Sequence, residues 1–269
     1  MRRYVCVHGH FYQPPRENPW LGTVERQPGA APYHDWNERI TTECYRPNAT
    51  ARILDGQGRI RRITSNYGRM SFNVGPTLLA WLEEEAPDVY AAILEADRTS
   101  RRRFSGHGSA LAQVYNHAIL PLAEARQRRT QVRWGLRDFE RRFGRPPEGM
   151  WLPETAVDVP TLETLAAEGL RFTILAPHQA RRVRALDGGE WRGVDERSLD
   201  TGRAYLQRLP SGRSIALFFY HGGLARGVAF EGLLESGEAF ADRLLAVARE
   251  GSGEDARLAH LAADGESYG

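Results

Sequence analysis

Met150-Trp151-Leu152-Pro153-Glu154-Thr155-Ala156 places a single carboxylate in an otherwise apolar and aromatic stretch of this 269-residue chain. Segment 149–152 reads as a short buried strand, and a proline fixes the backbone directly before Glu154. Apolar neighbours remove water from such a carboxylate, so we expect Glu154 to be desolvated, rigidly held and functional. A buried structural glutamate paired with one of the many arginines is the alternative interpretation.

A second acidic motif follows the last apolar run of the chain. Leu261-Ala262-Ala263 leads directly into Asp264 and Glu266, so both acids emerge at the end of a strand expected over 258–263. Cleavage of a glycosidic bond requires two carboxyl groups facing each other across the scissile bond. Glu154 and Asp264 are therefore a candidate catalytic pair.

The composition excludes several classes of function. The net charge is only +2, and the positive charge is spread along the chain, which argues against a nucleic-acid interface. All 36 residues counted as lysine plus arginine are arginine, which rules out Schiff-base, P-loop and carboxylated lysines. Two cysteines cannot build a disulfide framework. No apolar run reaches the roughly 18 residues of a membrane span, so we expect a cytoplasmic protein without membrane partners.

Strands alternate with helices along the chain, which predicts one α/β domain over residues 1–269 with a parallel sheet or a (β/α) barrel. Segment 11–47 is rich in proline, glycine and aromatic residues, and we expect an ordered loop over the mouth of a site. We expect strands over 4–7, 149–152, 172–175, 203–209, 214–220 and 258–263, with parallel strands ending near His10, Trp151, Leu175, Tyr220 and Ala263. We expect helices over 76–97 with a break at Pro87, over 109–143 in two pieces divided near Pro121, after Asp158, and over 236–250.

Histidines mark further candidate positions. His8 and His10 are two residues apart at a strand end and face the same side. They are candidates for contact with substrate or nucleophile, for a structural role or for metal binding. His117, read as helical, is a candidate for the site or for core packing. His221 follows the strand expected over 214–220 and is the fourth candidate.

Four motifs in order resemble those of glycoside hydrolase family 57. The first strand of that family carries histidines before Gln-Pro, its second motif has a histidine ahead of Leu-Pro, its nucleophile motif is Trp-x-Pro-Glu, and its general-acid motif is Asp-x-Glu followed by an aromatic residue and glycine. The matching segments are His8 to Pro14, with two extra residues before Gln13, His117 to Pro121, Trp151 to Glu154, and Asp264 to Gly269. The chain looks like an uncharacterised, larger branch of the family, in which a long C-terminal region follows.

The resemblance implies a TIM-like (β/α)7 barrel that acts on an α-glucan or maltooligosaccharide by a retaining mechanism without a cofactor. Glu154 would be the nucleophile and Asp264 the acid/base. The resemblance and the residues together suggest substrate-binding positions at His8, His10, His117, Trp151, His221 and Glu266. No helix follows the final strand, so we expect the barrel to be incomplete at its C-terminus, which would leave the chain inactive alone.

Other functions remain open at this point. Amidohydrolase-type metal sites begin with a His-x-His motif such as His8-x-His10 and include a late aspartate. Their bridging lysine is absent from this chain, and only Glu154 could replace it. A polysaccharide deacetylase-like metal site needs an early Asp-Asp or a His-x3-His pair, and neither is present. A glycan-binding fragment without catalysis is the third alternative. The sequence does not choose between hydrolysis, glucan transfer and branching.

Overall fold

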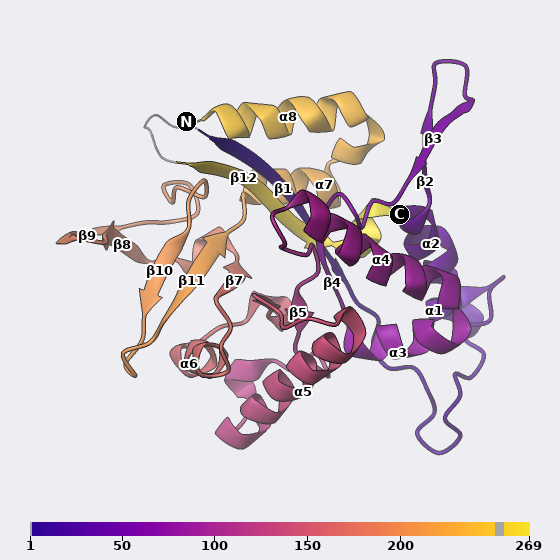
Figure 1. Ribbon diagram of the computed structural model, residues 1–269, viewed down its shortest axis with the longest axis horizontal. Coiled ribbons are helices and arrows are strands. Elements are labelled where there is room, and N and C mark those ends of the chain that lie inside the picture. Colours follow the sequence, from indigo (N-terminus) through magenta and orange to yellow (C-terminus); the bar gives the residue numbers. More distant parts are fainter. Residues whose placement is uncertain (1, 251–255) are drawn as a thin grey trace.

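Parallel strands form the centre of the computed structural model, which describes residues 2–250 and 256–269 (Figure 1). One sheet has the order β12-β1-β4, with both neighbours parallel to β1. Two further parallel pairs are β5 with β6 and β7 with β11. These strands are β1 (Arg3–Phe11), β4 (Ser71–Val74), β5 (Ala112–Gln113), β6 (Met150–Trp151), β7 (Phe172–Leu175), β11 (Ser214–Phe219) and β12 (Arg257–Asp264).

Single contacts connect these sheets to one another. A parallel bridge joins Phe72 to Ala110 next to β5, and another joins Gly149 to Phe172 between β6 and β7. At the end of β11, the backbone N–H of His221 donates to the carbonyl of His260 in β12, at 2.8 Å. No closed sheet is found within residues 2–250 and 256–269. The prediction of an α/β fold with parallel strands is confirmed, whereas the (β/α)7 barrel stays a prediction.

Helices pack around the strands (Figure 1). The break at Pro87 is confirmed, because one helix ends at Glu85 and the next begins at Pro87. The carboxylate of Asp158 caps α6 by accepting from the N–H of Thr161. The main helices are α3 (Pro76–Glu85), α4 (Pro87–Arg103), α5 (Ala125–Phe143), α6 (Val159–Ala167), α7 (Gly222–Phe230) and α8 (Gly237–Arg249).

Helix α5 lies directly against the strand that carries Gln113. A Cβ atom added at Gly135 would lie only 2.1 Å from the carbonyl oxygen of Gln113. Only glycine allows this close approach, so Gly135 sets the distance between α5 and β5. The core beside this contact includes Val132 and Met150, both fully buried.

The aromatic core connects the end of β1 to a helical segment at 36–49. Phe11 is fully buried and packs edge-on against Tyr45 and Tyr67, with ring centroids 6.0 and 5.1 Å apart. Replacing a buried phenylalanine by alanine costs about 3–5 kcal/mol. The segment comprises α1 (Trp36–Ile40), a π-helical turn (Thr41–Tyr45) and α2 (Arg46–Ala49). The prediction of a loop up to residue 47 is therefore wrong for this part, where Asp35 caps α1.

The region 109–121 also differs from its prediction. It was expected to be helical, but Ala112–Gln113 forms β5 and pairs with β6. A run of buried apolar residues here fits a helix face as well as a strand covered on both sides: Ala110, Leu111, Ala112 and Val114. Pairing with neighbouring strands makes this segment a strand. His117 has a φ of +54°, so it lies in a turn and not on a helix.

Antiparallel hairpins complete the structure. The two strands expected over 203–209 and 214–220 are present as β10 (Tyr205–Arg208) and β11, which pair antiparallel. Two further hairpins lie on the surface and were not predicted: β2 (Ala51–Leu54) with β3 (Ile60–Thr64), and β8 (Arg182–Ala185) with β9 (Gly188–Gly193). Among the described residues, no helix is both long and apolar enough to cross a membrane.

Candidate active site

The first group of polar side chains lies at the carboxyl ends of three adjacent strands, β12, β1 and β4. His10 in β1 lies opposite Asp264 in β12 and opposite Asn73 in β4. His8 lies one layer deeper, opposite Ala262 and Ser71. Because residues two apart on a strand share a face, His8 and His10 face the same side, as predicted.

The next strand pair adds Gln113 and Trp151, which are register partners in β5 and β6. Both side chains are buried, at 2% and 6% exposed. Within the described residues, Nε2 of Gln113 and Nε1 of Trp151 have no hydrogen-bond acceptor. Two buried donors without partners are unusual in a folded protein.

A stack of rings brings four of the predicted site residues together. Trp151 stacks on His8 and on His10, each at 5.1 Å between ring centroids. His10 in turn stacks on His117 at 5.2 Å, and Tyr12 covers His117 at 3.8 Å. The faces of Trp151 that meet the histidines are closed to a sugar, so contact between Trp151 and substrate stays a prediction.

Asn73 holds the two strand histidines through its side-chain amide. Its Oδ1 lies 3.0 Å from Nε2 of His8, and its Nδ2 lies 2.8 Å from Nδ1 of His10. The same Nδ2 donates to Oε1 of Gln113 at 2.5 Å. Nδ1 of His8 contacts the hydroxyl of Ser71 at 2.9 Å. Both ring nitrogens of His8 are thereby occupied and its side chain is buried, which favours a structural role over contact with substrate.

Burial keeps these histidines neutral. Desolvation lowers the pKa of His8 to about 4, and the hydrogen bond that His8 donates to Asn73 opposes this by raising it. Desolvation and the neighbouring His117 and His8 lower the pKa of His10 to about 3. The pKa of His117 is also lowered by burial, whereas the nearby Glu154 carboxylate raises it. Neutral imidazoles act as hydrogen-bond donors and acceptors, and do not supply a cation.

Glu154 lies on a strained turn directly after β6. Its φ is +56° and that of Thr155 is +51°, a left-handed conformation that costs non-glycine residues energy and is found at functional sites. Trp151, Leu152 and Pro153 are buried, but the reversed backbone turns Glu154 outward and its side chain is exposed. The expectation that its apolar neighbours would bury Glu154 is therefore wrong.

The Glu154 charge acts on Asp264 electrostatically. Desolvation raises the pKa of the Asp264 carboxyl, and the Glu154 carboxylate raises it further. Asp264 has an exposed surface, but the protein crowds its carboxyl enough to disfavour the charged form. The Glu154 charge also acts on His117, so one carboxylate influences both His117 and Asp264.

The helical segment 36–49 holds Glu266 in place. The hydroxyl of Tyr45 donates to Oε1 of Glu266 at 2.5 Å. Burial raises the pKa of Glu266, and the hydrogen bond from Tyr45 opposes that effect. The same segment contacts the chain around Glu266 twice more, where Sγ of Cys44 lies 3.4 Å from the carbonyl of Gly265 and Nδ2 of Asn48 lies 3.1 Å from that of Tyr268.

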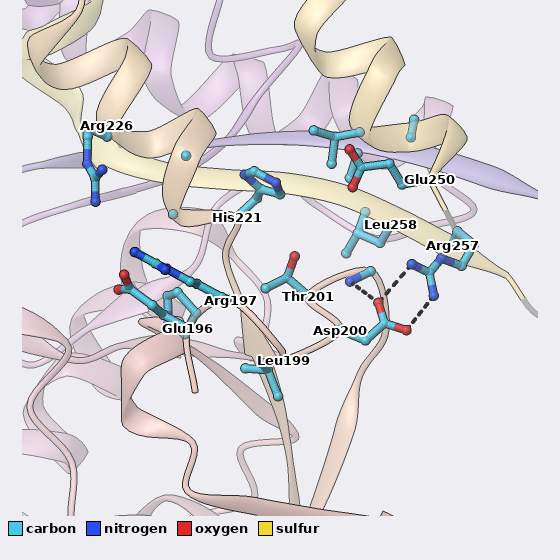
Figure 2. A pocket seen from close by; sticks show the side chains of 17 residues that line it. Glu196, Arg197, Leu199, Asp200, Thr201, His221, Arg226, Glu250, Arg257 and Leu258 are labelled. Carbon is cyan, nitrogen blue, oxygen red and sulfur yellow. Dashed lines mark hydrogen bonds and ion pairs between the residues drawn. The ribbon is translucent and has the colours of Figure 1, made fainter. Parts of the chain in front are cut away.

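His221 lies elsewhere, at the start of α7. Its Nδ1 accepts from the N–H of Leu224 at 3.1 Å, which caps the helix. It lines a cavity of about 380 Å³ beside Arg257, which is paired with Asp200 (Figure 2). The structure therefore brings His8, His10, His117 and Trp151 together, but places His221 in a cavity that none of these four residues lines.

A metal site would need ligands that these residues do not offer. Among the described residues, no group of three or more His, Cys, Asp or Glu side chains is arranged to hold a metal ion. Asn73, Ser71 and His117 contact the ring nitrogens that a His-x-His metal site would use. This arrangement does not favour the two metal-dependent alternatives.

Sequence reasoning missed Asn73 and Gln113 as site residues. Both are buried amides on short strands, and neither belongs to a motif of acids or histidines. The available signal was the placement of Asn73 within the apolar stretch Phe72-Asn73-Val74, because a polar residue inside a buried strand needs partners.

Comparison with known proteins places this chain in a family. The family profile of glycosyl hydrolase family 57 matches residues 11–269. No curated protein matches the chain significantly.

Several solved structures share the fold at low sequence identity. A 4-alpha-glucanotransferase from Thermococcus litoralis is 18% identical with a TM-score of 0.67, and the match covers 100% of this chain and 34% of the enzyme. A maltose-forming amylase from Pyrococcus sp. ST04 is 16% identical with a TM-score of 0.67, covering 98% of this chain and 42% of the amylase. A branching enzyme from Pyrococcus horikoshii is 16% identical with a TM-score of 0.62, covering 100% and 64%.

These three likenesses concern the fold, and the chain spans between about a third and two thirds of the proteins it matches. The family profile, in contrast, matches nearly the whole of this chain. It includes the segments that carry His117, Glu154 and Asp264. The chain therefore belongs to glycosyl hydrolase family 57.

Proposed function

We propose that the chain carries the catalytic site of a retaining glycoside hydrolase or glucanotransferase that acts on α-glucans. The observation that supports this best is the placement of two carboxyl groups at strand ends, Glu154 just after β6 and Asp264 at the end of β12, where the Glu154 charge helps to raise the pKa of Asp264. Pairs of carboxyl groups whose environments separate their protonation behaviour are typical of glycosidase sites. The family and its α-glucan-active members support the substrate class.

Glu154 is the nucleophile in this proposal. Its exposed carboxylate attacks the anomeric carbon, and the bond from that carbon to the leaving oxygen breaks as a glycosyl-enzyme ester forms. The strained backbone at Glu154 supports this role, because strain is retained where a side chain must be held in one orientation.

Asp264 is the acid/base. Its raised pKa favours the protonated form that donates a proton to the leaving oxygen in the first step. In the second step the Asp264 carboxylate takes a proton from water or from an acceptor hydroxyl, which releases the sugar from Glu154. Retaining enzymes hold the two carboxyls about 5–5.5 Å apart, and we assign this pair to that class.

We further propose that the seven parallel strands form one barrel-like wall in the order β12, β1, β4, β5, β6, β7 and β11. The pairs and bridges between neighbouring strands support this order, as does the hydrogen bond from His221 to His260. Glu154 and Asp264 then lie at the carboxyl ends of their strands, where barrel enzymes place their chemistry.

The remaining candidates are proposed to contact sugar hydroxyls to different degrees. His117 is half-buried, contacts His10 and is influenced by the Glu154 charge. Glu266 lies two residues after Asp264, with Tyr45 fixing one of its oxygens. His8 and Trp151 pack behind these groups and hold them in place. His221 would contact only a substrate long enough to reach its separate cavity.

The configuration of the first product tests the proposal. Proton NMR of a maltooligosaccharide digest, recorded before mutarotation, should show the α-anomer. Initial formation of the β-anomer would exclude retention and thereby the role of Glu154 as nucleophile. Adding a glucose acceptor in the same assay separates glucan transfer from hydrolysis, because transfer lengthens the acceptor.

A further inference from the structure

Asn73 contacts more site residues than any simple packing role requires. It is fully buried in β4 and its amide meets His8, His10 and Gln113 at once. A carboxamide has two N–H donors and one acceptor oxygen. In the observed arrangement Nδ2 donates to His10 and to Gln113, and Oδ1 accepts from His8, so the amide uses both of its N–H donors.

These bonds fix where the proton of His10 resides. Nδ1 of His10 accepts from Asn73, so this nitrogen carries no proton. Burial lowers the pKa of His10 to about 3, so the ring is neutral near pH 7 and its single proton lies on Nε2. That N–H faces Nε2 of His117 at 3.1 Å and donates to it.

The same logic continues to His117. Since Nε2 of His117 accepts from His10, a neutral His117 carries its proton on Nδ1. Tyr12 stacks on this ring at 3.8 Å and limits its rotation. Trp151, three residues before Glu154, stacks on His10 at 5.1 Å, so Glu154 leaves its strand beside the pair of His10 and His117, and its charge acts on His117.

We propose that Asn73 is a positioning residue that fixes the tautomers of His10 and His117, so that His117 offers its Nδ1–H to the Glu154 carboxylate. This inference rests on the proposed function of Glu154 as nucleophile. A hydrogen bond to one carboxylate oxygen holds the group ionised and leaves the other oxygen to attack the sugar. Asn73 itself touches neither substrate nor nucleophile.

The substitution Asn73→Asp tests the tautomers directly. An ionised carboxylate of the same shape can only accept hydrogen bonds, so it should draw the proton of His10 to Nδ1. Nε2 of His10 then becomes an acceptor, and His117 should move its proton to Nε2. Asn37→Asp is the matched control, since Asn37 is equally buried but only accepts from Nε of Arg16.

Nitrogen-15 NMR of the imidazole rings reads this outcome in the folded protein without any substrate. We expect Nε2–H on His10 and Nδ1–H on His117 in the wild type and in Asn37→Asp, and the reverse in Asn73→Asp. Asn73→Ala, which admits water, should leave both tautomers of His10 populated and serves if the aspartate variant does not fold. A wild-type His10 protonated on Nδ1, or a His117 tautomer that ignores both substitutions at Asn73, would overturn the inference.

Kinetics separate this inference from the proposed function. In a form of the enzyme that turns over α-glucans, Asn73→Asp should lower kcat by on the order of 10²-fold while KM changes little, because only the nucleophile's environment is altered. If the tautomers of His10 and His117 reverse as expected but kcat is unchanged, these tautomers do not affect Glu154 and the inference fails. If Glu154→Gln leaves kcat intact, the proposed function fails instead, whatever the tautomers are.

Discussion

His10 and Asp264 are register partners at the carboxyl ends of β1 and β12, so the proposed acid/base lies one strand away from the imidazole that contacts His117. Glu154 reaches the same region from β6, beyond β4 and β5, and its charge acts on both His117 and Asp264. A nucleophile and an acid/base that approach from different strands can face each other across a sugar ring.

Replacing the proposed nucleophile should abolish turnover without unfolding the protein. Glu154→Gln is expected to lower kcat by on the order of 10³-fold or more, because no covalent intermediate forms. The side chain is exposed, so the melting temperature should stay near that of the wild type. Glu190→Gln, at an exposed glutamate of β9, is the matched control. Activity above roughly a tenth of the wild-type value would rule out the assignment.

The same substitution should change the titration of Asp264. Desolvation is the larger cause of its raised pKa and the Glu154 charge is the smaller one. Glu154→Gln removes the smaller cause, so the pKa of Asp264 should fall but stay above that of an exposed aspartate. Carbon-13 NMR of the side-chain carboxyl measures this value. An unchanged pKa would mean that the two carboxyls do not interact.

Removing the hydroxyl of Tyr45 should destabilise the Asp264–Tyr268 region. Tyr45→Phe deletes the hydrogen bond to the partly buried Glu266 carboxyl and should lower the free energy of unfolding by about 1–3 kcal/mol. The pKa of Glu266 should rise further, because the Tyr45 bond opposes the effect of burial. Denaturant titration gives the stability, with Tyr115→Phe, at a partly exposed tyrosine, as the control. Equal losses in both variants would contradict a specific role for the Tyr45 bond.

Acid should unfold the protein through its buried histidines. Burial lowers the pKa values of His8, His10 and His260 to about 4, 3 and 4, below the ordinary value of 6.5. The unfolded chain therefore binds protons first as the pH falls. The stability is fully present above about pH 6.5 and is lost as the pH falls toward the folded pKa values, by roughly 1.4 kcal/mol per pH unit for each histidine.

His260 isolates one of these contributions. His260→Gln removes one titrating group, so the decline in melting temperature between about pH 6 and pH 4 should become shallower. His178→Gln, at an exposed histidine, should keep the wild-type slope. Thermal unfolding followed by circular dichroism across this range provides the slopes. Parallel curves for wild type and His260→Gln would show that His260 does not stay neutral when folded.

Sequence patterns predicted much of the central framework. The strands that end near His10, Trp151, Leu175, Tyr220 and Ala263 are present, because buried apolar runs flanked by turn residues have few alternatives. The helix after Asp158 was also predicted, from its cap, its proline and its terminal glycine.

The elements that the sequence did not predict depend on tertiary partners. Helix α7 begins with two glycines, which favour turns, and is held by His221 as its cap. Helices α1 and α2 lie in a proline-rich segment, where packing of Tyr45 against Phe11 overrides weak local preferences. The position of His117 depends on a left-handed turn that no local sequence pattern predicts.

The candidate site shows the same division. Acids and histidines stand out in the sequence because their chemistry is distinctive, so Glu154, Asp264, His10 and His117 could be chosen in advance. The amide of Asn73 was not chosen, because its importance arises only when β4 lies beside β1. The exposure of Glu154 was mispredicted, because the positive φ that turns it outward has no signature in its apolar neighbours.

Trapping the glycosyl-enzyme tests the central claim most directly. A 5-fluoro-α-glucosyl fluoride slows the second step, so the ester should accumulate in an enzyme form that turns over α-glucans. Peptide mass spectrometry should then find the added sugar on the peptide that contains Glu154, and Glu154→Gln should remain unlabelled. A sugar attached to Asp264, to Glu266 or to any other residue while Glu154 stays unmodified would contradict the account.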